Sequence, residues 1–203
     1  MIRHGESEWN AVQRWQGWED VPLTATGEAQ ALARARSLAA PQARRFAAVF
    51  ASDLTRAART AELIAGYLGL DPPAIDAGLR ERHGGDWQGL TRDEIEEGWP
   101  GMREAWRRGE AHSPPGGEGD ASVLERVDQA IARLCALVDE GASALVVTHH
   151  GVLRLVSTRA GVPPATLIPN LGGRWFTWNG EELYPGEVLG ALPDPLDETP
   201  ATE

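Results

Sequence analysis

The sequence of 203 residues contains no lysine, and all 19 of its cationic side chains are arginines. This absence excludes P-loop nucleotide binding and Schiff-base catalysis, because both chemistries depend on a lysine amine. Arginine instead suits the bidentate recognition of phosphate and carboxylate groups. A coding bias, which the abundant alanine, glycine and proline support, also explains this composition, so the arginines alone do not assign a ligand.

Cysteine is almost absent too, since Cys135 is the only one in the sequence. An internal disulfide and a thiolate metal cluster are therefore excluded. Cys135 lies in a helical pattern of apolar residues, which predicts a core thiol in a reducing cytoplasm. The sequence also has no apolar run of membrane-spanning length and no signal-peptide pattern, so we expect no membrane partner.

The acidic balance of the chain, a net charge of −11, argues against nucleic acid as a partner. An anionic ligand would need a pocket whose local charge is positive although the chain as a whole is negative. Metal-ligand spacings such as His-x-Asp or His-Glu-x-x-His do not occur, which argues against a metal-dependent enzyme. We expect neither a metal nor a cofactor, and a homodimer is the one macromolecular assembly that we consider.

Alternating strand and helix patterns predict an α/β fold, with three α/β/α layers around a mostly parallel central sheet. The length suits one domain over residues 1–192, with an insertion at about 79–118 that covers the sheet. The Pro- and acid-rich residues 193–203 predict a disordered tail. The expected strands are 48–51, 74–76 and 144–148, the expected helices are 24–39, 53–68, 91–97, 101–108, 120–138 and 151–160, and Asn179-Gly180 predicts a hairpin turn.

Two tetrads combine histidine with glycine: Arg3-His4-Gly5-Glu6 and Thr148-His149-His150-Gly151. Each follows a short apolar run, and strand ends followed by glycine turns form the ligand crevices of α/β sheets, so we expect one shared pocket. Neighbours on an extended segment face opposite sides, so only one of His149 and His150 is expected to face the pocket. The first run, Met1-Ile2, is shorter than a typical strand of about five residues, and we expect the numbering to begin inside the natural protein.

Longer blocks of the sequence resemble the histidine phosphatase superfamily, also called the phosphoglycerate mutase-like family. The first block is Arg3-His4-Gly5-Glu6-Ser7-Glu8-Trp9-Asn10, and the others follow in the order of the family up to about residue 160. They comprise Gln16-Gly17, Asp20, Pro22-Leu23-Thr24, Gly27, Gln30-Ala31, Ser52-Asp53-Leu54, Arg56-Ala57, Thr60-Ala61, Glu81-Arg82-His83, Gly89, Gly117-Glu118, His149, Gly151 and Arg154. The resemblance implies a phosphoglycerate mutase-like fold and phosphoryl transfer without a metal.

The resemblance also implies roles for individual residues. His4 is expected to be the nucleophile that becomes phosphorylated, and Glu81 is expected to be the proton donor. Arg3, Arg56 and His149 are expected to bind the phosphoryl oxygens. The residues expected to line the substrate pocket are Asn10, Gln16 and Gly17.

These residue types suit phosphoryl-transfer chemistry. The transition state spreads negative charge over its equatorial oxygens, which two guanidiniums and an imidazole can stabilise. An unprotonated imidazole is a good nucleophile near neutral pH, and its phosphoramidate is labile enough to hydrolyse. A carboxyl group can protonate the leaving alkoxide and then activate water. An inactive family member that binds phospho-ligands is an alternative, but such proteins usually lack the nucleophile or the acid.

The segment between Glu81 and His149 favours a phosphatase over a mutase. Mutases of the family have a longer insertion that keeps water from the phosphohistidine, whereas this segment is short and resembles the phosphatase branches. Against this, Trp106-Arg107-Arg108 resembles a basic pair that mutases use on the substrate carboxylate, although a solvated helix end explains it as well. We therefore predict a metal-independent phosphomonoesterase for a small metabolite such as a phosphoglycerate or sugar-phosphate ester. Arg107 and Arg108 are candidate substrate-binding residues, and phosphoglycerate mutase is the alternative activity.

Overall fold

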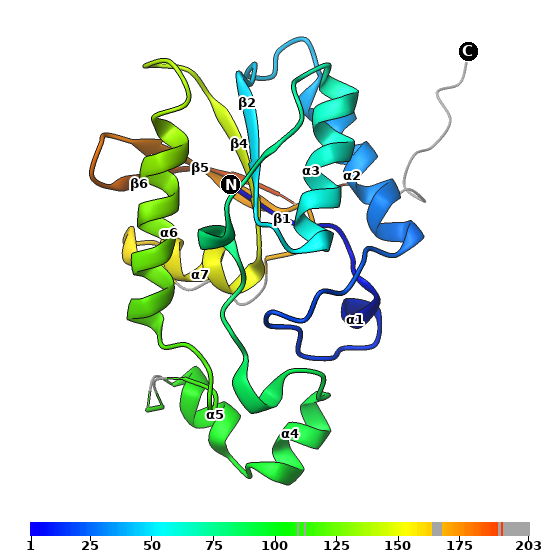
Figure 1. The fold of residues 1–203 in the computed structure, drawn as a ribbon, viewed down its shortest axis with the longest axis vertical. Coiled ribbons are helices and arrows are strands. Elements are labelled where there is room, and N and C mark those ends of the chain that lie inside the picture. Colours follow the sequence, from blue (N-terminus) through cyan, green and yellow to red (C-terminus); the bar gives the residue numbers. More distant parts are fainter. Residues whose placement is uncertain (109, 112, 164–167, 191, 193–203) are drawn as a thin grey trace.

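A six-stranded sheet forms the centre of the protein in a computed structural model (Figure 1). The structure describes residues 1–108, 110, 111, 113–163, 168–190 and 192. In the spatial order β3-β2-β4-β1-β5-β6, the strands are β3 (Ala74–Ile75), β2 (Ala48–Ala51), β4 (Ala144–Thr148), β1 (Ile2–Arg3), β5 (Gly173–Trp178) and β6 (Leu183–Leu189). The first four pair in parallel, whereas β5 is antiparallel to both β1 and β6. The sheet is therefore mostly parallel, as predicted.

Helices cover both faces of this sheet. They are α1 (Glu8–Ala11), α2 (Ala25–Leu38), α3 (Thr55–Leu68), α4 (Arg92–Gly98), α5 (Met102–Arg107), α6 (Asp120–Cys135) and α7 (His150–Arg159), with 3-10 turns η1 (Ala77–Leu79) and η2 (Gly85–Trp87). Side chains of α2 and α3 share one core with Leu145 and Val147 of β4, and side chains of α6 and α7 share the other with Val146. Alternate residues of one strand thus bury into opposite layers. The predicted three-layer α/β/α architecture is confirmed (Figure 1).

The predicted strand bounds 48–51 and 144–148 coincide with β2 and β4. The helix expected over 53–68 begins two residues later, at Thr55, and the helix expected over 120–138 ends at Cys135. Leu54, not Asp53, is the N-cap of α3, and Gly119, not Asp120, is the N-cap of α6; neither start has a side-chain cap. Both aspartates instead form ion pairs, Asp53 with Arg80 and Asp120 with Arg82. The two aspartates thus form charge-assisted bonds instead of capping their helices. These bonds hold the chain at Arg80 and Arg82, on either side of Glu81.

The first strand has only two residues, yet it is held on both sides. Ile2 lies opposite Val147 of β4 and opposite Gly173 of β5, and it is 1% exposed. A Cβ atom on Gly173 would lie 2.1 Å from the Met1 carbonyl oxygen, so glycine permits the close approach of β5. The pairing of β1 with two neighbours explains how so short a strand can place the next residue, His4.

The predicted hairpin joins β5 and β6, with a loop of residues 179–182 rather than a two-residue turn. The side-chain oxygen of Asn179 accepts the backbone N–H groups of Glu181 and Glu182, which closes the loop. Gly180 has φ +104°, a conformation that suits glycine.

The predicted insertion contains α4 and α5, which lie beyond the sheet at the bottom of Figure 1. Backbone hydrogen bonds of 2.8 Å join Trp15 to Leu90 and Gly89 to Trp15, so this segment is tied to the loop after α1. The tail predicted over 193–203 lies outside the described residues, and the extent of the single domain, 1–192, stays a prediction.

Candidate active site

The two histidine tetrads meet at the carboxyl ends of β1 and β4. The backbone N–H of His4 donates to the Thr148 carbonyl at 3.0 Å, and Arg3 lies opposite Thr148 in the sheet. A cavity of about 520 Å³ opens at this edge, between the strand ends and α5. It is lined by most of the predicted site residues: Arg3, His4, Asn10, Gln16, Gly17, Arg56, Glu81 and Arg107.

The surroundings of His4 hold its imidazole ring in one neutral form. Its Nδ1 atom lies 2.6 Å from the Gly5 carbonyl oxygen. Because a carbonyl only accepts hydrogen bonds, Nδ1 carries the proton and Nε2 keeps its lone pair. Burial, followed by the charges of Arg56 and Arg3, holds the pKa of His4 well below 6.5, so the ring stays unprotonated at neutral pH.

A close backbone contact fixes the loop that carries this histidine. A Cβ atom on Gly5 would lie 2.5 Å from the Gly27 carbonyl oxygen, so glycine is required for the loop to reach the start of α2. The Gly5 N–H also donates to the buried Thr60 hydroxyl of α3 at 3.0 Å. Helices α2 and α3 therefore position His4, the predicted nucleophile, through its neighbour Gly5.

Two buried guanidiniums supply positive charge. Arg56 is 0% exposed and donates to the carbonyls of Glu19 at 2.7 Å and Gly17 at 2.8 Å, while Arg3 donates to the Ile168 carbonyl at 2.9 Å. Burial lowers the pKa of Arg56 to about 10, with opposing effects from nearby carboxylates, so it is charged at neutral pH. The Nε groups of Arg3 and Arg56 are buried and have no partner among the described residues.

His149 lies directly beside His4, with ring centroids 5.1 Å apart and an edge-to-face angle of 62°. It is fully buried, and neither ring nitrogen has a hydrogen-bond partner within the described parts of the chain. Burial and then Arg56 hold its pKa well below 6.5. Such buried polar atoms are costly unless a ligand or water satisfies them, so they mark a place where a polar group binds.

Of the two neighbouring histidines, it is His150, and not the expected His149, that lines the cavity. His149 is instead buried beside the His4 ring. The alternation rule does not apply here because His149 is the N-cap of α7 and His150 is already helical. Burial lowers the pKa of His150 against the opposing charge of Glu81, and Arg3 and Arg154 lower it further.

Glu81 faces the cavity with its carboxylate held by two backbone donors. The Arg82 N–H donates to Oε1 at 2.8 Å, and the Gly151 N–H donates to Oε2 at 3.0 Å. A Cβ atom on Gly151 would lie 2.3 Å from Oε1, so glycine after the second histidine makes room for this carboxylate. The general acid predicted from the sequence thus lies at the second tetrad.

The predicted pocket residues Asn10 and Gln16 belong to one polar network. The Ser7 hydroxyl donates to the Gln16 side-chain oxygen at 2.7 Å, and the Asn10 side chain accepts the Ser7 N–H at 3.3 Å. Asn170, which the sequence analysis missed, donates to the His4 carbonyl at 2.9 Å. No motif surrounds Asn170, and its position depends on the turn into β5, so no local signal could have identified it.

The remaining wall of the cavity consists mainly of arginine and tryptophan, most of which sequence analysis did not assign to the site. These further lining residues are Arg14, Trp15, Arg82, Arg103, Trp106, His150, Gly151 and Arg154. Trp106 is central, because the guanidiniums of Arg82 and Arg154 both lie 5.4 Å from its ring. Arg103 and Arg154 have no acidic partner within 4.0 Å among the residues described.

The predicted basic pair is divided between two environments. Arg107 lines the cavity and donates to Glu104 at 2.8 Å. Arg108 does not line it, and its guanidinium pairs with Glu110 at 2.7 Å. The structure therefore brings only Arg107 to the pocket, and the interpretation of Arg108 as a solvated helix end agrees with its position.

Within the described ranges, no three or more His, Cys, Asp or Glu side chains gather closely enough to hold a metal ion. Nor does any helix in those ranges have the length and apolar character to cross a membrane.

Comparison with known proteins agrees with this geometry. The sequence model of the histidine phosphatase superfamily (branch 1) matches residues 1–181. The chain is 37% identical to glucosyl-3-phosphoglycerate phosphatase of Mycolicibacterium vanbaalenii, over 96% of this chain and 88% of that protein. It is 40% identical to a 2,3-bisphosphoglycerate-dependent phosphoglycerate mutase of a Methylobacterium species, over 90% of this chain and 88% of that protein.

Solved structures give the same assignment. The structure of mycobacterial glucosyl-3-phosphoglycerate phosphatase in complex with VO3 superposes with a TM-score of 0.78 at 32% identity, covering 93% of this chain and 95% of that one. The predicted family, fold class and enzyme class, a phosphatase of that family, are confirmed by these relatives. The chain belongs to the histidine phosphatase superfamily, branch 1.

Proposed function

We propose that the protein hydrolyses phosphate monoesters through a phosphohistidine formed on His4. The observation that carries this proposal is the His4 ring, whose proton is directed to Gly5 and whose Nε2 lone pair is free to attack. The unpartnered donors of Arg3, Arg56 and His149 surround it, and no carboxylate occupies them in the described residues. A phosphoryl group would satisfy these donors.

In the first step, Nε2 of His4 attacks phosphorus and the bond from phosphorus to the ester oxygen breaks. Glu81 gives its proton to that oxygen, so that the alcohol leaves neutral and Glu81 becomes a carboxylate. Arg3, Arg56 and a hydrogen bond from His149 stabilise the charge on the equatorial oxygens.

In the second step, water attacks the phosphohistidine and the bond between phosphorus and Nε2 breaks. The Glu81 carboxylate takes one proton from the water, which restores the acid for the next turnover. Inorganic phosphate leaves, and His4 returns to the neutral form that its surroundings favour.

The substrate that we propose is a small phosphorylated metabolite, such as a phosphoglycerate or a sugar-phosphate ester. The name glucosyl-3-phosphoglycerate phosphatase, carried by related proteins, fits this class. Arg103, Arg107 and Arg154 line the cavity in a chain whose net charge is −11, so this wall is a local positive region suited to a carboxylate. Trp106, whose ring lies beneath the guanidiniums of Arg82 and Arg154, adds an aromatic surface to this wall.

Phosphoglycerate mutase activity is the second candidate, because relatives of similar identity carry that name. A mutase must return the phosphoryl group to its bound product before water reaches it. Incubation with 3-phosphoglycerate and a trace of the 2,3-bisphosphate separates the two activities. We expect steady release of inorganic phosphate and little 2-phosphoglycerate, whereas efficient formation of 2-phosphoglycerate without phosphate release would identify a mutase.

Rapid quenching with a labelled phosphomonoester tests the covalent intermediate. The label should appear on the peptide that contains His4, should be stable in base and should be lost in acid. EDTA should leave turnover intact, whereas a requirement for added zinc or magnesium would contradict the mechanism.

We also propose that the protein works in the cytoplasm, where its free Cys135 would stay reduced, and that it forms a homodimer. Light scattering of the purified chain tests the second statement, because a monomer at all concentrations would exclude a dimer.

A further inference from the structure

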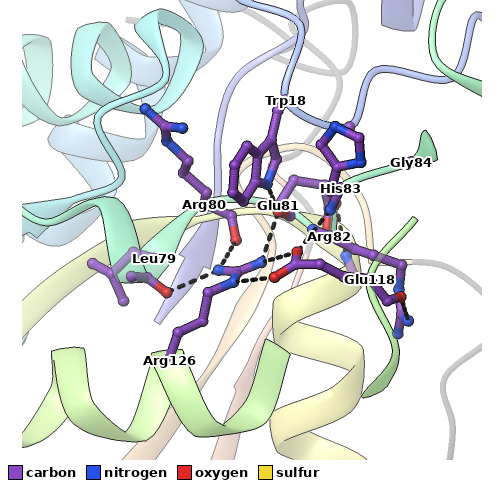
Figure 2. Close-up of polar contacts among 12 residues, drawn as sticks. Trp18, Leu79, Arg80, Glu81, Arg82, His83, Gly84, Glu118 and Arg126 are labelled. Carbon is purple, nitrogen blue, oxygen red and sulfur yellow. Dashed lines mark hydrogen bonds and ion pairs between the residues drawn. The ribbon is translucent and has the colours of Figure 1, made fainter. Parts of the chain in front are cut away.

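Arg126 of α6, with Glu118, holds the backbone on which the proposed general acid is built. Its Nη1 donates to the carbonyls of Gly78 at 2.9 Å and Arg80 at 2.6 Å, and its Nη2 donates to the Glu81 carbonyl at 2.8 Å. Figure 2 shows this guanidinium between the backbone segment that carries Glu81 and the carboxylate of Glu118. One side chain thus contacts three carbonyls in four consecutive residues.

Glu118 completes the arrangement from the other side. It receives two bonds from Arg126, 2.9 Å to Oε1 and 2.8 Å to Oε2, and its Oε2 also accepts the His83 N–H at 2.8 Å. Both side chains are largely buried, 18% and 17% exposed. Burial opposes ionisation of Glu118, but the hydrogen bonds from Arg126 and His83 outweigh it and lower its pKa, so the pair is ionised at neutral pH.

The geometry of a single peptide unit connects this ion pair to the reaction. The Glu81 carbonyl and the Arg82 N–H belong to the same planar peptide, so the direction of one fixes the direction of the other. The carbonyl is held by Arg126 and by the Trp18 indole N–H at 2.6 Å. The N–H donates to Oε1 of Glu81 itself at 2.8 Å. If the carbonyl loses its donors, the peptide can rotate, and the carboxyl group loses one of its two backbone partners.

We propose that Arg126 and Glu118 are positioning residues, which fix the Glu81 carboxyl through the peptide between Glu81 and Arg82. This inference rests on the proposed role of Glu81 as general acid. It makes a specific demand: loss of the ion pair should impair protonation of the leaving group more than formation of the bond between His4 and phosphorus. A pair that only stabilises the fold would have no such selectivity.

The test compares Arg126→Met with Arg133→Met. Arg133 lies on the same helix and binds Asp76 with two bonds of 2.9 Å, so it also ties α6 to the chain before Glu81, but no bond joins it to residues 80–83. Each variant is assayed with p-nitrophenyl phosphate, whose leaving group needs little protonation, and with 3-phosphoglycerate, whose alkoxide needs it. Glu81→Gln is the reference for complete loss of the acid, and thermal unfolding of every variant is measured in parallel.

For Arg126→Met, we expect kcat on 3-phosphoglycerate to fall by about 30-fold or more and kcat on p-nitrophenyl phosphate by less than about 3-fold, within the range of general acid catalysis. Arg133→Met should change the two substrates equally and little. If Arg126→Met does not fold, Arg126→Lys and Glu118→Gln replace it in the test. Each keeps part of the hydrogen-bond network, so each should lower kcat on 3-phosphoglycerate more than on p-nitrophenyl phosphate, but by a smaller factor.

Two outcomes separate failure of this inference from failure of the proposed function. In the first outcome, Glu81→Gln lowers kcat more on 3-phosphoglycerate than on p-nitrophenyl phosphate, but the Arg126 and Glu118 variants lose activity equally on both substrates. Arg126 is then a structural residue, and the inference is overturned. If Glu81→Gln itself lacks the bias, Glu81 is not the general acid, and the proposed mechanism fails first.

Discussion

The two ends of the cavity are built in different ways. At the reaction end, His4, Arg56 and His149 are 0–3% exposed, and their backbone and side-chain contacts come from distant parts of the sheet and its helices. At the opposite end, Arg107 is 56% exposed on a helix of six residues, and its nearest partner is a carboxylate one turn away on the same helix. Local ion pairs of this kind contribute little to stability. The side chains of the buried end are held in one arrangement, which suits a single reaction. The side chains of the exposed end can be substituted to suit a different substrate with little loss of folding stability.

Replacement of the nucleophile should have the largest effect. His4→Ala removes the atom that forms the bond to phosphorus, so we expect kcat to fall by about 10⁴-fold or more, as for nucleophiles in other covalent mechanisms. Steady-state phosphate release and quench-labelling of the variant measure this loss. Near-normal turnover with no label at position 4 would contradict both the mechanism and the contrast between the two ends.

Arg56→Ala should lower kcat by about 100-fold or more, because a preorganised donor to the transition state is lost. The effect should appear in kcat for aryl and alkyl phosphates alike, since charge on the phosphoryl oxygens is common to both. This equality distinguishes Arg56 from the general acid. The variant also loses the bonds to Glu19 and Gly17, so circular dichroism must confirm that it folds.

Burial at the reaction end predicts a pH dependence of stability. The folded-state pKa values of His4 and His149 lie well below 6.5, whereas the unfolded chain binds protons at about 6.5. Below pH 6.5 the unfolded state therefore gains protons that the folded state does not, and the free energy of unfolding should fall as the pH decreases from 6.5 toward those lowered pKa values. At pH 5.5 the decrease should reach about 1–3 kcal/mol for the pair.

Urea unfolding at pH 8, 7, 6 and 5.5 measures this change, with no dependence expected between pH 7 and 8 from these two groups. His149→Asn should show a smaller decrease than the original protein. The ionised Asp53, Asp76 and Glu118 have lowered pKa values and contribute only at more acidic pH. Burial also lowers the pKa of His150, and it lowers that of the Met1 α-amino group to about 5, so both groups add to the decrease in this window. The difference between the original protein and His149→Asn therefore isolates the contribution of His149. A midpoint that is constant from pH 8 to 5.5 would mean that the histidines are not buried as described.

The smallest effect is expected at the exposed end, where the chain offers a matched pair. Arg107→Ala should raise KM for 3-phosphoglycerate by about 3- to 10-fold, in line with a single solvent-exposed charge contact, and should leave p-nitrophenyl phosphate unchanged. Arg108→Ala changes the adjacent residue, which pairs with Glu110 away from the cavity, and should change neither KM. Equal effects of the two substitutions would mean that long-range charge, not a contact from Arg107, attracts the substrate.

The reaction end was largely predictable from the sequence, and the reason is local. His4 and Glu81 lie in motifs whose flanking residues, including Gly5, have visible steric functions in the structure. The strand ends that carry the two tetrads were identified from apolar runs, and parallel pairing then brings them to the same edge. The roles assigned to these residues remain predictions that the substitutions above test.

The exposed end could not be predicted in the same way. The position of Arg103 and Trp106 depends on how a helix of six residues packs over the cavity, and so short a segment has no periodic signal. His150 was misjudged because His149 is the N-cap of α7 and His150 is already helical, so the alternation of an extended segment does not apply to them. In each case the deciding factor is tertiary packing or the ending of an element, which are the least predictable features of a sequence.

The position of β1 has a consequence for folding. Ile2 lies between Val147 and Gly173, so the strand that orients His4 cannot pair until residues far along the chain have been made and ordered. Contacts of such high sequence separation form slowly, because the chain entropy is lost before the contacts compensate for it. We therefore expect the His4 site to assemble late in folding, so that a partly folded chain should not catalyse phosphoryl transfer.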